Sequence, residues 1–377
     1  MRNCCVIGPV KSGTTLMISL LDAHPQLSLF PLEVKFFTHW FERLSSPRTQ
    51  FNDLSTFFLD KSKIRLMNHQ LSDQKDLMNS GRIDFSGFDF ARFREFVESR
   101  LNDHQLDSQV GDDRFVTFYR EIHAALNEIV FNPGAKWIVS KEGNHGAKHI
   151  EHIREVFPKT KFIVLCRDPR DIFASFKAIS RRKVEGLHSP TFGVYVSPSS
   201  YVYDNKQKNI TAYEDVYSKY REDEDFLFVK YEQLVRDVEE EMRRVVDFLE
   251  IDFENVLVRP TNLGNLWGGN ASELMAFSKV RSERVGKWQS VLKRSEIQVL
   301  ERFLGRYLLQ CNYPGHQKRQ GRTWQVVLSV LTTEANALRG YMKSANILAI
   351  GKRILKTIAL LSKSVIFAVW APDDLGR

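Results

Sequence analysis

Short apolar runs alternate with helical stretches along the first 170 residues. Cys4–Ile7 and Leu27–Phe30 each end at a Gly-Pro or Pro position, so both are expected to be short buried strands. Thr14–Ala23 lies between them, and its apolar residues recur with helical periodicity. The order strand, loop, helix, strand is typical of a parallel α/β unit.

The alternation continues beyond these residues and predicts one α/β domain with a central parallel sheet flanked by helices. Residues 181–208, which hold Gly, Pro, Ser and Tyr, predict a long surface loop that helps to build a ligand pocket. Strands are expected at Lys136–Ser140, Lys161–Cys166 and Phe226–Val229, and helices at Arg114–Phe131, Gly146–Phe157, Pro169–Ser180, Glu232–Leu249 and Ser295–Leu309.

The composition excludes several classes of protein. With 377 residues, 43% of them hydrophobic, the chain is long enough and apolar enough for a full core. Its net charge of +8 favours anionic partners. Four cysteines are too few for a disulfide scaffold and lack metal-site spacing, which favours a reducing, cytoplasmic location and no metal centre. No apolar stretch is long enough for a membrane span, and no signal segment follows Met1.

The C-terminal residues differ in character, and we expect a basic amphipathic helical extension over 317–377 after a main domain of residues 1–316. Asn346–Trp370 is apolar around most of a helical circumference. Its basic side chains fall within about 100° of one another on a helix; they are Lys352, Arg353, Lys356 and Lys363. Three interpretations stay open: packing on the domain, peripheral docking on an anionic membrane, or an oligomer contact.

The strongest chemical signal is the loop Gly8–Thr15, with the sequence GPVKSGTT, between the first strand and the first helix. It has the P-loop frame, in which backbone N–H groups and a helix N-terminus cradle a phosphate. Nucleotide triphosphatases carry Lys where this chain has Thr14, and here the lysine lies within the loop at Lys11. A sulfuryl group leaving from a phosphate suits a cradle of this kind, because it depends less on a metal ion.

The segment Lys11-Ser12-Gly13-Thr14-Thr15 resembles the 5′-phosphosulfate loop of sulfotransferases that use 3′-phosphoadenosine 5′-phosphosulfate (PAPS) and release PAP. Arg167 at a strand end, with Ser175 eight residues later, resembles the pair that binds the cofactor's 3′-phosphate in that family. Taken alone, the run of charges from Arg167 to Asp171 is also consistent with a structural ion-pair cluster. The resemblance implies a P-loop-like fold.

Two further segments resemble the same family. Phe228–Glu232 is similar to a segment whose tyrosine, here Tyr231, lies near the adenine, and Arg281–Trp288 is similar to a loop that closes over the 3′-phosphate. The resemblance therefore implies PAPS as cofactor, held by Lys11, Ser12, Gly13, Thr14, Thr15, Arg167, Ser175, Tyr231, Arg281 and Gly286.

The catalytic base is open between two residues. Glu33, in Glu33-Val34-Lys35-Phe36-Phe37, matches the base of the glycan-modifying branch of the family, whereas His145 lies two residues beyond the position of the small-molecule branch's histidine. Lys141 matches a lysine at the substrate cleft of the glycan branch, and Lys11 is expected to neutralise the leaving phosphate.

These residues predict metal-independent, in-line transfer of a sulfuryl group from PAPS to a hydroxyl, on a carbohydrate or glycolipid if Glu33 is the base. Alternatives are sulfonation of a small phenol, alcohol or lipid with a His base, a nucleotide-dependent kinase, and an inactive nucleotide- or membrane-binding protein. Nucleic acid is not an expected partner, because the basic residues that can be placed belong to the anion site or the terminal helix. The oligomeric state is open.

Overall fold

A computed structural model of the chain describes residues 1–30, 35–44, 89–103, 111–130, 132–184, 197–203, 209–266, 280–314 and 323–342, with Ile354, Thr357, Ile358 and Ser362. Glu33 and most of the predicted helix Asn346–Trp370 lie outside these residues. The chain divides into two compact units. Unit 1 comprises residues 1–8, 13–165 and 222–281, and unit 2 comprises residues 9–12, 166–221 and 282–377.

Unit 1 contains a five-stranded parallel sheet in the order β2-β3-β1-β4-β5, which confirms the predicted α/β class. The central strand β1 has β3 and β4 as neighbours, so the carboxyl ends of these three parallel strands lie at one edge of the sheet. In α/β sheets, ligands bind outside the carboxyl ends of the strands, at the point where the connections from two neighbouring strands run to opposite sides. The strands are β1 (Arg2–Ile7), β2 (Leu27–Leu29), β3 (Trp137–Gly143), β4 (Lys161–Cys166) and β5 (Phe226–Lys230).

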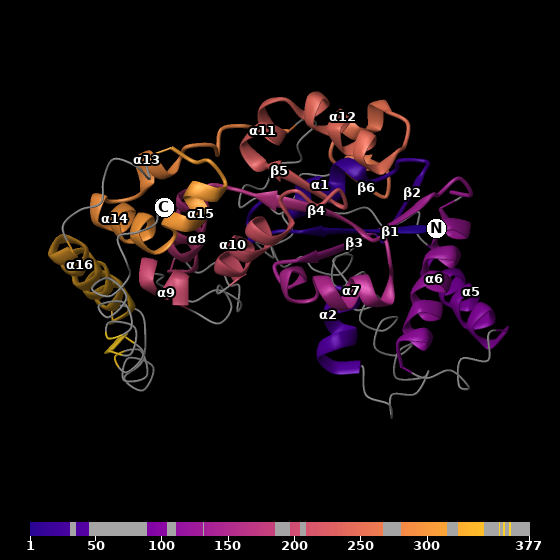
Figure 1. Ribbon diagram of the computed structural model, residues 1–377, viewed down its shortest axis with the longest axis horizontal. Coiled ribbons are helices and arrows are strands. Elements are labelled where there is room, and N and C mark those ends of the chain that lie inside the picture. Colours follow the sequence, from indigo (N-terminus) through magenta and orange to yellow (C-terminus); the bar gives the residue numbers. More distant parts are fainter. Residues whose placement is uncertain are drawn as a thin grey trace. The chain divides into compact units, whose positions relative to one another are not determined.

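Helices cover both faces of this sheet (Figure 1). Alternate residues of the strands, such as Val6, Val139 and Ile163, form one core with α1 (Thr14–Leu21), α11 (Tyr231–Arg236) and α12 (Val238–Leu249). The other face is covered by α2 (Phe36–His39), α6 (Gly111–Ile129) and α7 (Ile150–Val156). The remaining elements of unit 1 are η1 (Trp40–Leu44), α5 (Phe90–Asp103), η4 (Gly146–Lys148), η5 (Asn255–Val258), β6 (Thr261–Asn262) and β7 (Asn265–Leu266).

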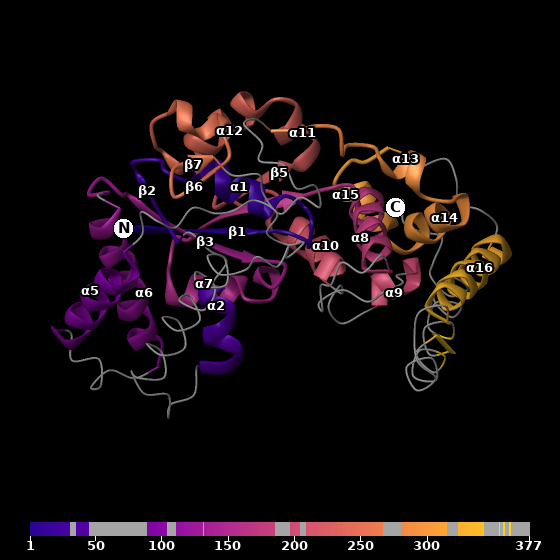
Figure 2. The same cartoon turned by 180° about the vertical axis from the view of Figure 1, so that it is seen from behind.

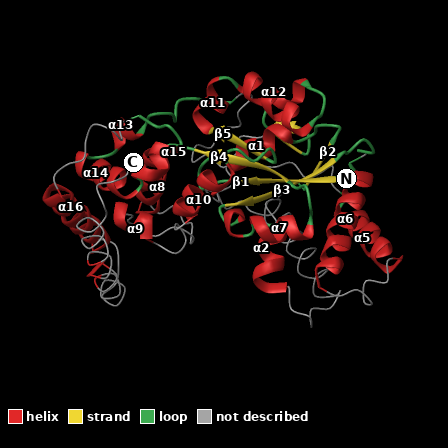
Figure 3. Ribbon diagram, viewed as in Figure 1, coloured by secondary structure: helices red, strands yellow, loops and turns green. Residues whose placement is uncertain are grey.

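Unit 2 is helical in its described residues (Figure 3). Its longest helix, α16, packs along α14, and Ser329 on α16 donates a hydrogen bond of 2.8 Å to Gln298 Oε1 on α14 (Figure 2). The helices are α8 (Pro169–Val184), α9 (Pro198–Tyr203), α10 (Asn209–Tyr220), α13 (Trp288–Val291), α14 (Arg294–Phe303), α15 (Gly305–Gln310) and α16 (Thr323–Met342).

Most predicted elements are present, and the differences have local causes. The expected helix Glu232–Leu249 is two helices, because Asp237 interrupts the first and accepts a hydrogen bond from the Glu240 N–H as the cap of the second. The expected helix Ser295–Leu309 is likewise interrupted at Leu304. Within the expected loop 181–208, α8 continues to Val184 and α9 forms over Pro198–Tyr203, so that prediction is wrong for those residues.

In the part of the chain that the structure describes, no helix is both long enough and apolar enough to cross a bilayer. All four cysteines are buried, and none of them forms a disulfide bond. A boundary at residue 316 between a main domain and an extension stays a prediction.

Candidate active site

Gly13 in unit 1 has a backbone that only glycine adopts easily. Its φ is 104°, and it precedes the first turn of α1. A Cβ atom added there would lie 2.6 Å from Cδ2 of Tyr231, the first residue of α11. The Tyr231 ring therefore lies directly against the loop. Two residues that the family resemblance marked as cofactor-binding are in contact, although 218 positions separate them.

Lys141 reaches the start of α1 from β3. Its Nζ donates a hydrogen bond of 2.6 Å to Oγ1 of Thr15, while Thr14 is buried in the same first turn. Because Thr15 accepts from Lys141, its own hydroxyl proton is directed to another acceptor. A lysine thus lies beside a helix N-terminus, where backbone N–H groups favour an anion. Nucleotide triphosphatases place a lysine on the helix itself, and here β3 supplies one.

The middle of the loop belongs to unit 2. Lys11 has a φ of 67°, and its carbonyl oxygen accepts a 3.0 Å hydrogen bond from Nη1 of Arg167. Nη2 of Arg167 lies 3.3 Å from the carbonyl oxygen of Arg284 and donates to it. Arg167 is only 6% exposed. One buried guanidinium at the end of β4 therefore ties the Gly8–Thr15 loop to the segment that contains Arg284.

Ser12 is the other informative residue of this loop. Its side chain is completely buried, and its hydroxyl has no hydrogen-bond partner among the described residues. A buried hydroxyl without a partner is unfavourable by about 1–3 kcal/mol, so such groups point to a missing ligand. The Gly13 turn and the start of α1, both in unit 1, fit a phosphate or sulfate group, and Ser12 directly precedes them in the sequence.

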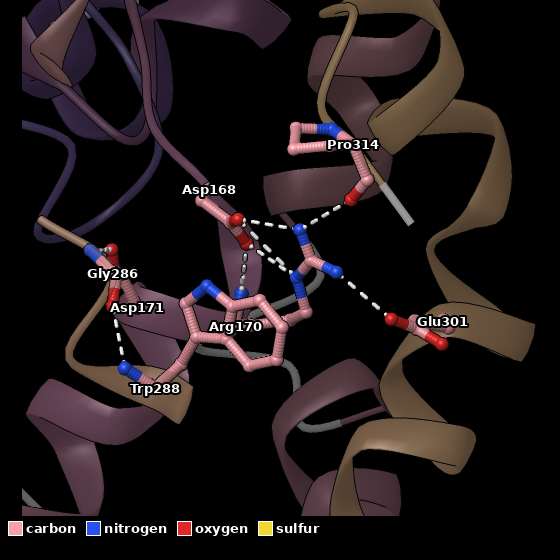
Figure 4. Close-up of polar contacts among 7 residues, drawn as sticks. All are labelled: Asp168, Arg170, Asp171, Gly286, Trp288, Glu301 and Pro314. Atoms are coloured by element: carbon pink, nitrogen blue, oxygen red, sulfur yellow. Dashed lines mark hydrogen bonds and ion pairs between the residues drawn. The ribbon is translucent and has the colours of Figure 1, made fainter. Parts of the chain in front are cut away.

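The charged residues that follow Arg167 form a structural cluster (Figure 4). The Arg170 guanidinium is 1% exposed and makes hydrogen bonds to both carboxylate oxygens of Asp168. It also donates to Glu301 and to the carbonyl of Pro314, and it lies 4.0 Å from the centre of the Trp288 ring. The ion-pair interpretation is therefore correct for Asp168 and Arg170. Arg167 differs, because its guanidinium donates to the backbone carbonyl groups of Lys11 and Arg284.

Asp171 holds the segment that carries Gly286. Its two carboxylate oxygens accept hydrogen bonds from the backbone N–H groups of Gly286 at 2.7 Å and of Trp288 at 2.8 Å (Figure 4). Burial raises the pKa of Asp171, and the two N–H donors oppose this shift. Gly286 has a φ of 73°, which suits the tight turn made here.

The remaining predicted cofactor residues are exposed enough to meet a ligand. Ser175 is half-buried on α8, eight residues after Arg167. Arg281 is half-buried and is the last residue of unit 1. Their roles in binding stay predictions.

Glu142, next to Lys141 on β3, positions the helix α2. It is completely buried and accepts hydrogen bonds from the Phe37 N–H, the Thr38 N–H and the Thr38 hydroxyl, at 3.2, 3.0 and 2.8 Å. Burial raises the pKa of Glu142, and these donors oppose the shift. Since α2 begins three residues after Glu33, this carboxylate anchors the end of the segment that carries the predicted base.

His145, the alternative base, lies in unit 1 before η4. Its Nδ1 is 3.7 Å from Oε1 of Glu42, and the same oxygen is 3.4 Å from Nε2 of His149. Burial, and then the positive charge of Lys35, lower the pKa of His145. A neutral imidazole at neutral pH can accept a proton, so His145 stays a candidate base, while Glu33 lies outside the described residues.

Three residues, Glu142, Arg170 and Asp171, were not predicted to be site residues; the last two were noted only as part of a possible ion-pair cluster. A signal existed for Glu142, since it is an acidic residue at the end of the apolar strand Trp137–Gly143, where burial demands hydrogen-bond donors. For Asp171 no local signal separates it from a solvated helix residue. Among the described residues no group of three His, Cys, Asp or Glu side chains is arranged to hold a metal ion.

Residues 4–255 of the chain match the sulfotransferase family. This match covers more than half of the chain, so the protein belongs to the sulfotransferase family. Sulfotransferases of this family use PAPS as the sulfuryl donor. The predicted family is therefore confirmed, and membership of its glycan-modifying branch stays a prediction.

Two curated relatives are the omega-hydroxy-beta-dihydromenaquinone-9 sulfotransferases of Mycobacterium bovis and Mycobacterium tuberculosis. Each is 32% identical over 162 residues, which are 40% of this chain and 38% of the relative. The chain thus matches well under half of the length of these relatives.

Two solved structures resemble the chain at lower sequence identity. The sulfotransferase domain from the curacin biosynthetic pathway has a TM-score of 0.47 and 16% identity, covering 83% of this chain and 98% of that domain. The sulfotransferase domain of the Synechococcus PCC 7002 olefin synthase has a TM-score of 0.43 and 18% identity, with coverage of 82% and 94%.

Proposed function

We propose that this protein transfers a sulfuryl group from PAPS to a hydroxyl group of a lipid acceptor. The observation that carries the reaction class is the loop Gly8–Thr15, in a chain that belongs to the sulfotransferase family. There the buried Ser12 hydroxyl has no partner among the described residues and Arg167 holds the Lys11 carbonyl. PAPS supplies a sulfuryl group whose departure leaves negative charge on the 5′-phosphate.

In this proposal the 5′ end of the cofactor is held by residues of the loop and of α1. Ser12 and Thr15 donate hydroxyl protons, the first residues of α1 donate backbone N–H groups, and Lys11 and Lys141 supply positive charge. Lysine charge beside the leaving oxygen stabilises the negative charge that develops on it. A metal ion is then not required.

At the other end of the cofactor, Arg167 and Ser175 would bind the 3′-phosphate and Tyr231 would lie near the adenine. A guanidinium is suited to a phosphate because it donates two parallel hydrogen bonds. The Asp171 contacts with Gly286 and Trp288 would keep the neighbouring loop in its folded position. Arg281 and Gly286 would close this part of the site.

The acceptor hydroxyl loses its proton as the oxygen–sulfur bond forms, and this requires a base. We propose Glu33 for this role, with His145 as the alternative. Support for Glu33 comes from its neighbours: Glu142 anchors α2 three residues later through three hydrogen bonds. A base is effective only when its position is fixed relative to the reacting hydroxyl.

A lipid is the acceptor class that we favour, a glycolipid included. The curated relatives are described as sulfotransferases of an omega-hydroxylated menaquinone, a lipid alcohol. The carbohydrate acceptor predicted from the Glu33 segment is compatible with this proposal if the sugar is attached to a lipid.

The experiment is a transfer assay with the purified full-length chain, radiolabelled PAPS and EDTA. We expect labelled product with polyprenyl alcohols or glycolipids presented in detergent, and little with soluble oligosaccharides or phenols. A labelled soluble sugar or phenol would refute the lipid acceptor and leave the reaction class intact. Transfer from ATP that depends on Mg²⁺, without any binding of PAP, would instead favour a kinase.

A further inference from the structure

Exposed apolar side chains concentrate near the C-terminus. Among the described residues, eight large hydrophobic side chains are exposed, and five of them lie between positions 324 and 358. Trp324, Leu328 and Leu331 on α16 are 59%, 55% and 44% exposed. Ile354 and Ile358 are exposed further along the chain.

The helix α16 has two opposite apolar faces. At about 100° per residue, Trp324, Leu328 and Leu331 fall within about 60° of one another. Four buried residues of α16 lie on the other side of the helix; they are Val326, Val330, Thr333 and Ala337. A helix that packs on its own unit needs only one such face, so the second face is available for a partner outside the unit.

The charge of the surrounding sequence indicates which partner. From Ala335 to Pro372 the sequence has no Asp or Glu, and its basic residues are Arg339, Lys343, Lys352, Arg353, Lys356 and Lys363. The exposed residues Ile354 and Ile358 alternate in sequence with these basic positions. Apolar side chains interleaved with Lys and Arg favour the surface of an anionic bilayer, where both contribute to binding.

A second copy of the chain is a less suitable partner. Pairing two such faces would place two strongly basic segments of the same sign close together, and repulsion opposes this. Tryptophan, which Trp324 places on this face, is also a side chain that accumulates at membrane–water interfaces.

We propose that the face formed by Trp324, Leu328 and Leu331 docks on an anionic lipid surface, supported by the basic residues that follow α16. The inference deepens the proposed function, because a membrane-borne acceptor requires the protein at the bilayer. Binding to vesicles is measured without PAPS or acceptor, however. Its failure therefore refutes the docking surface alone, and failure of the transfer assay refutes the reaction alone.

The test is co-sedimentation of the full-length chain with sucrose-loaded vesicles. We expect binding to equal parts of phosphatidylcholine and phosphatidylglycerol, weaker binding at higher salt, and little binding to phosphatidylcholine alone. Leu328→Ser should weaken the binding about tenfold, because it removes one buried leucine from the contact. The matched control is Leu309→Ser on α15, where the leucine is 41% exposed and outside the proposed face.

A second readout uses the Trp324 fluorescence. The emission should shift to shorter wavelength when anionic vesicles are added, and Trp324→Leu should abolish most of that shift while the variant still co-sediments. Absence of binding to anionic vesicles, or equal loss of binding with Leu309→Ser and Leu328→Ser, would overturn the proposal. So would a vesicle-free dimer in analytical ultracentrifugation that Leu328→Ser converts to a monomer, because that result assigns the face to a second copy.

Discussion

The replacement Arg167→Ala tests the cofactor site most directly. Arg167 is 6% exposed and donates to two backbone carbonyl groups, those of Lys11 and Arg284. Alanine removes both of these contacts and the charge that we assign to the 3′-phosphate. The loop Gly8–Thr15 then loses its tie to the end of β4, and the cofactor loses its partner.

The magnitude follows from these contacts. A hydrogen bond that involves a charged group contributes about 1.5–3 kcal/mol, and each 1.4 kcal/mol corresponds to about a tenfold change in a dissociation constant. Loss of a single phosphate contact should therefore weaken PAP binding by about 10- to 150-fold. Arg167→Lys keeps the positive charge but not the planar fork, so its loss should be smaller than that of alanine.

Calorimetric titration with PAP in EDTA measures the dissociation constant of each variant, since PAP binds without turnover. Arg154→Ala is the matched control: Arg154 is also partly buried and pairs with Asp223 and Asp225, outside the candidate site. It should lower the unfolding temperature and leave PAP affinity unchanged. If Arg167→Ala stays folded and binds PAP as tightly as the parent, the assignment of Arg167 to the cofactor is wrong.

Three further outcomes are expected. Lys11→Ala should lower kcat by more than it weakens PAP binding, because we assign Lys11 to the charge that develops only as the phosphate leaves. Steady-state kinetics measure kcat and calorimetry measures PAP affinity, and a loss of affinity with kcat unchanged would contradict the assignment. Glu33→Gln should lower kcat by about a hundredfold or more with PAP affinity nearly unchanged, and His145→Ala should act mainly on acceptor KM. A near-parental kcat for Glu33→Gln together with loss of kcat for His145→Ala would make His145 the base. His123 is fully buried, and burial lowers its pKa to about 3. The unfolded chain therefore binds more protons below pH 6.5, and the free energy of unfolding should fall by about 2 kcal/mol between about pH 6.5 and pH 5. Urea titrations should show that His123→Gln loses most of this slope and that the exposed His152→Gln keeps it.

Local patterns in the sequence were sufficient for the fold class. The strands at Cys4–Ile7 and Lys161–Cys166 and the helix that begins at Thr14 are where the patterns predicted them. Their apolar residues are contiguous or regularly spaced, so burial of each element is visible in a short window. The expected loop 181–208 was wrong in part because α9, Pro198–Tyr203, is only six residues long, which is too short for a helical periodicity to be detected in the sequence.

The tight turn before α1 could also be predicted, because Gly8 and Gly13 bracket the loop within a few residues; that the loop binds an anion stays a prediction. Local chemistry does not identify the catalytic base. Glu33 is predicted only from the resemblance of its segment to one in the family, and it lies outside the described residues.

Only the tertiary structure decided how the site is held together. Lys141 and Thr15, Glu142 and Thr38, and Asp171 and Gly286 are joined by hydrogen bonds across 126, 104 and 115 positions. Nothing in the sequence near any one of these residues indicates which distant residue is its hydrogen-bond partner. The sheet order β2-β3-β1-β4-β5 places β3 beside β1, and this neighbourhood brings Lys141 to the start of α1. Such contacts depend on which strands pair, and pairing is a property of the whole chain rather than of any window within it.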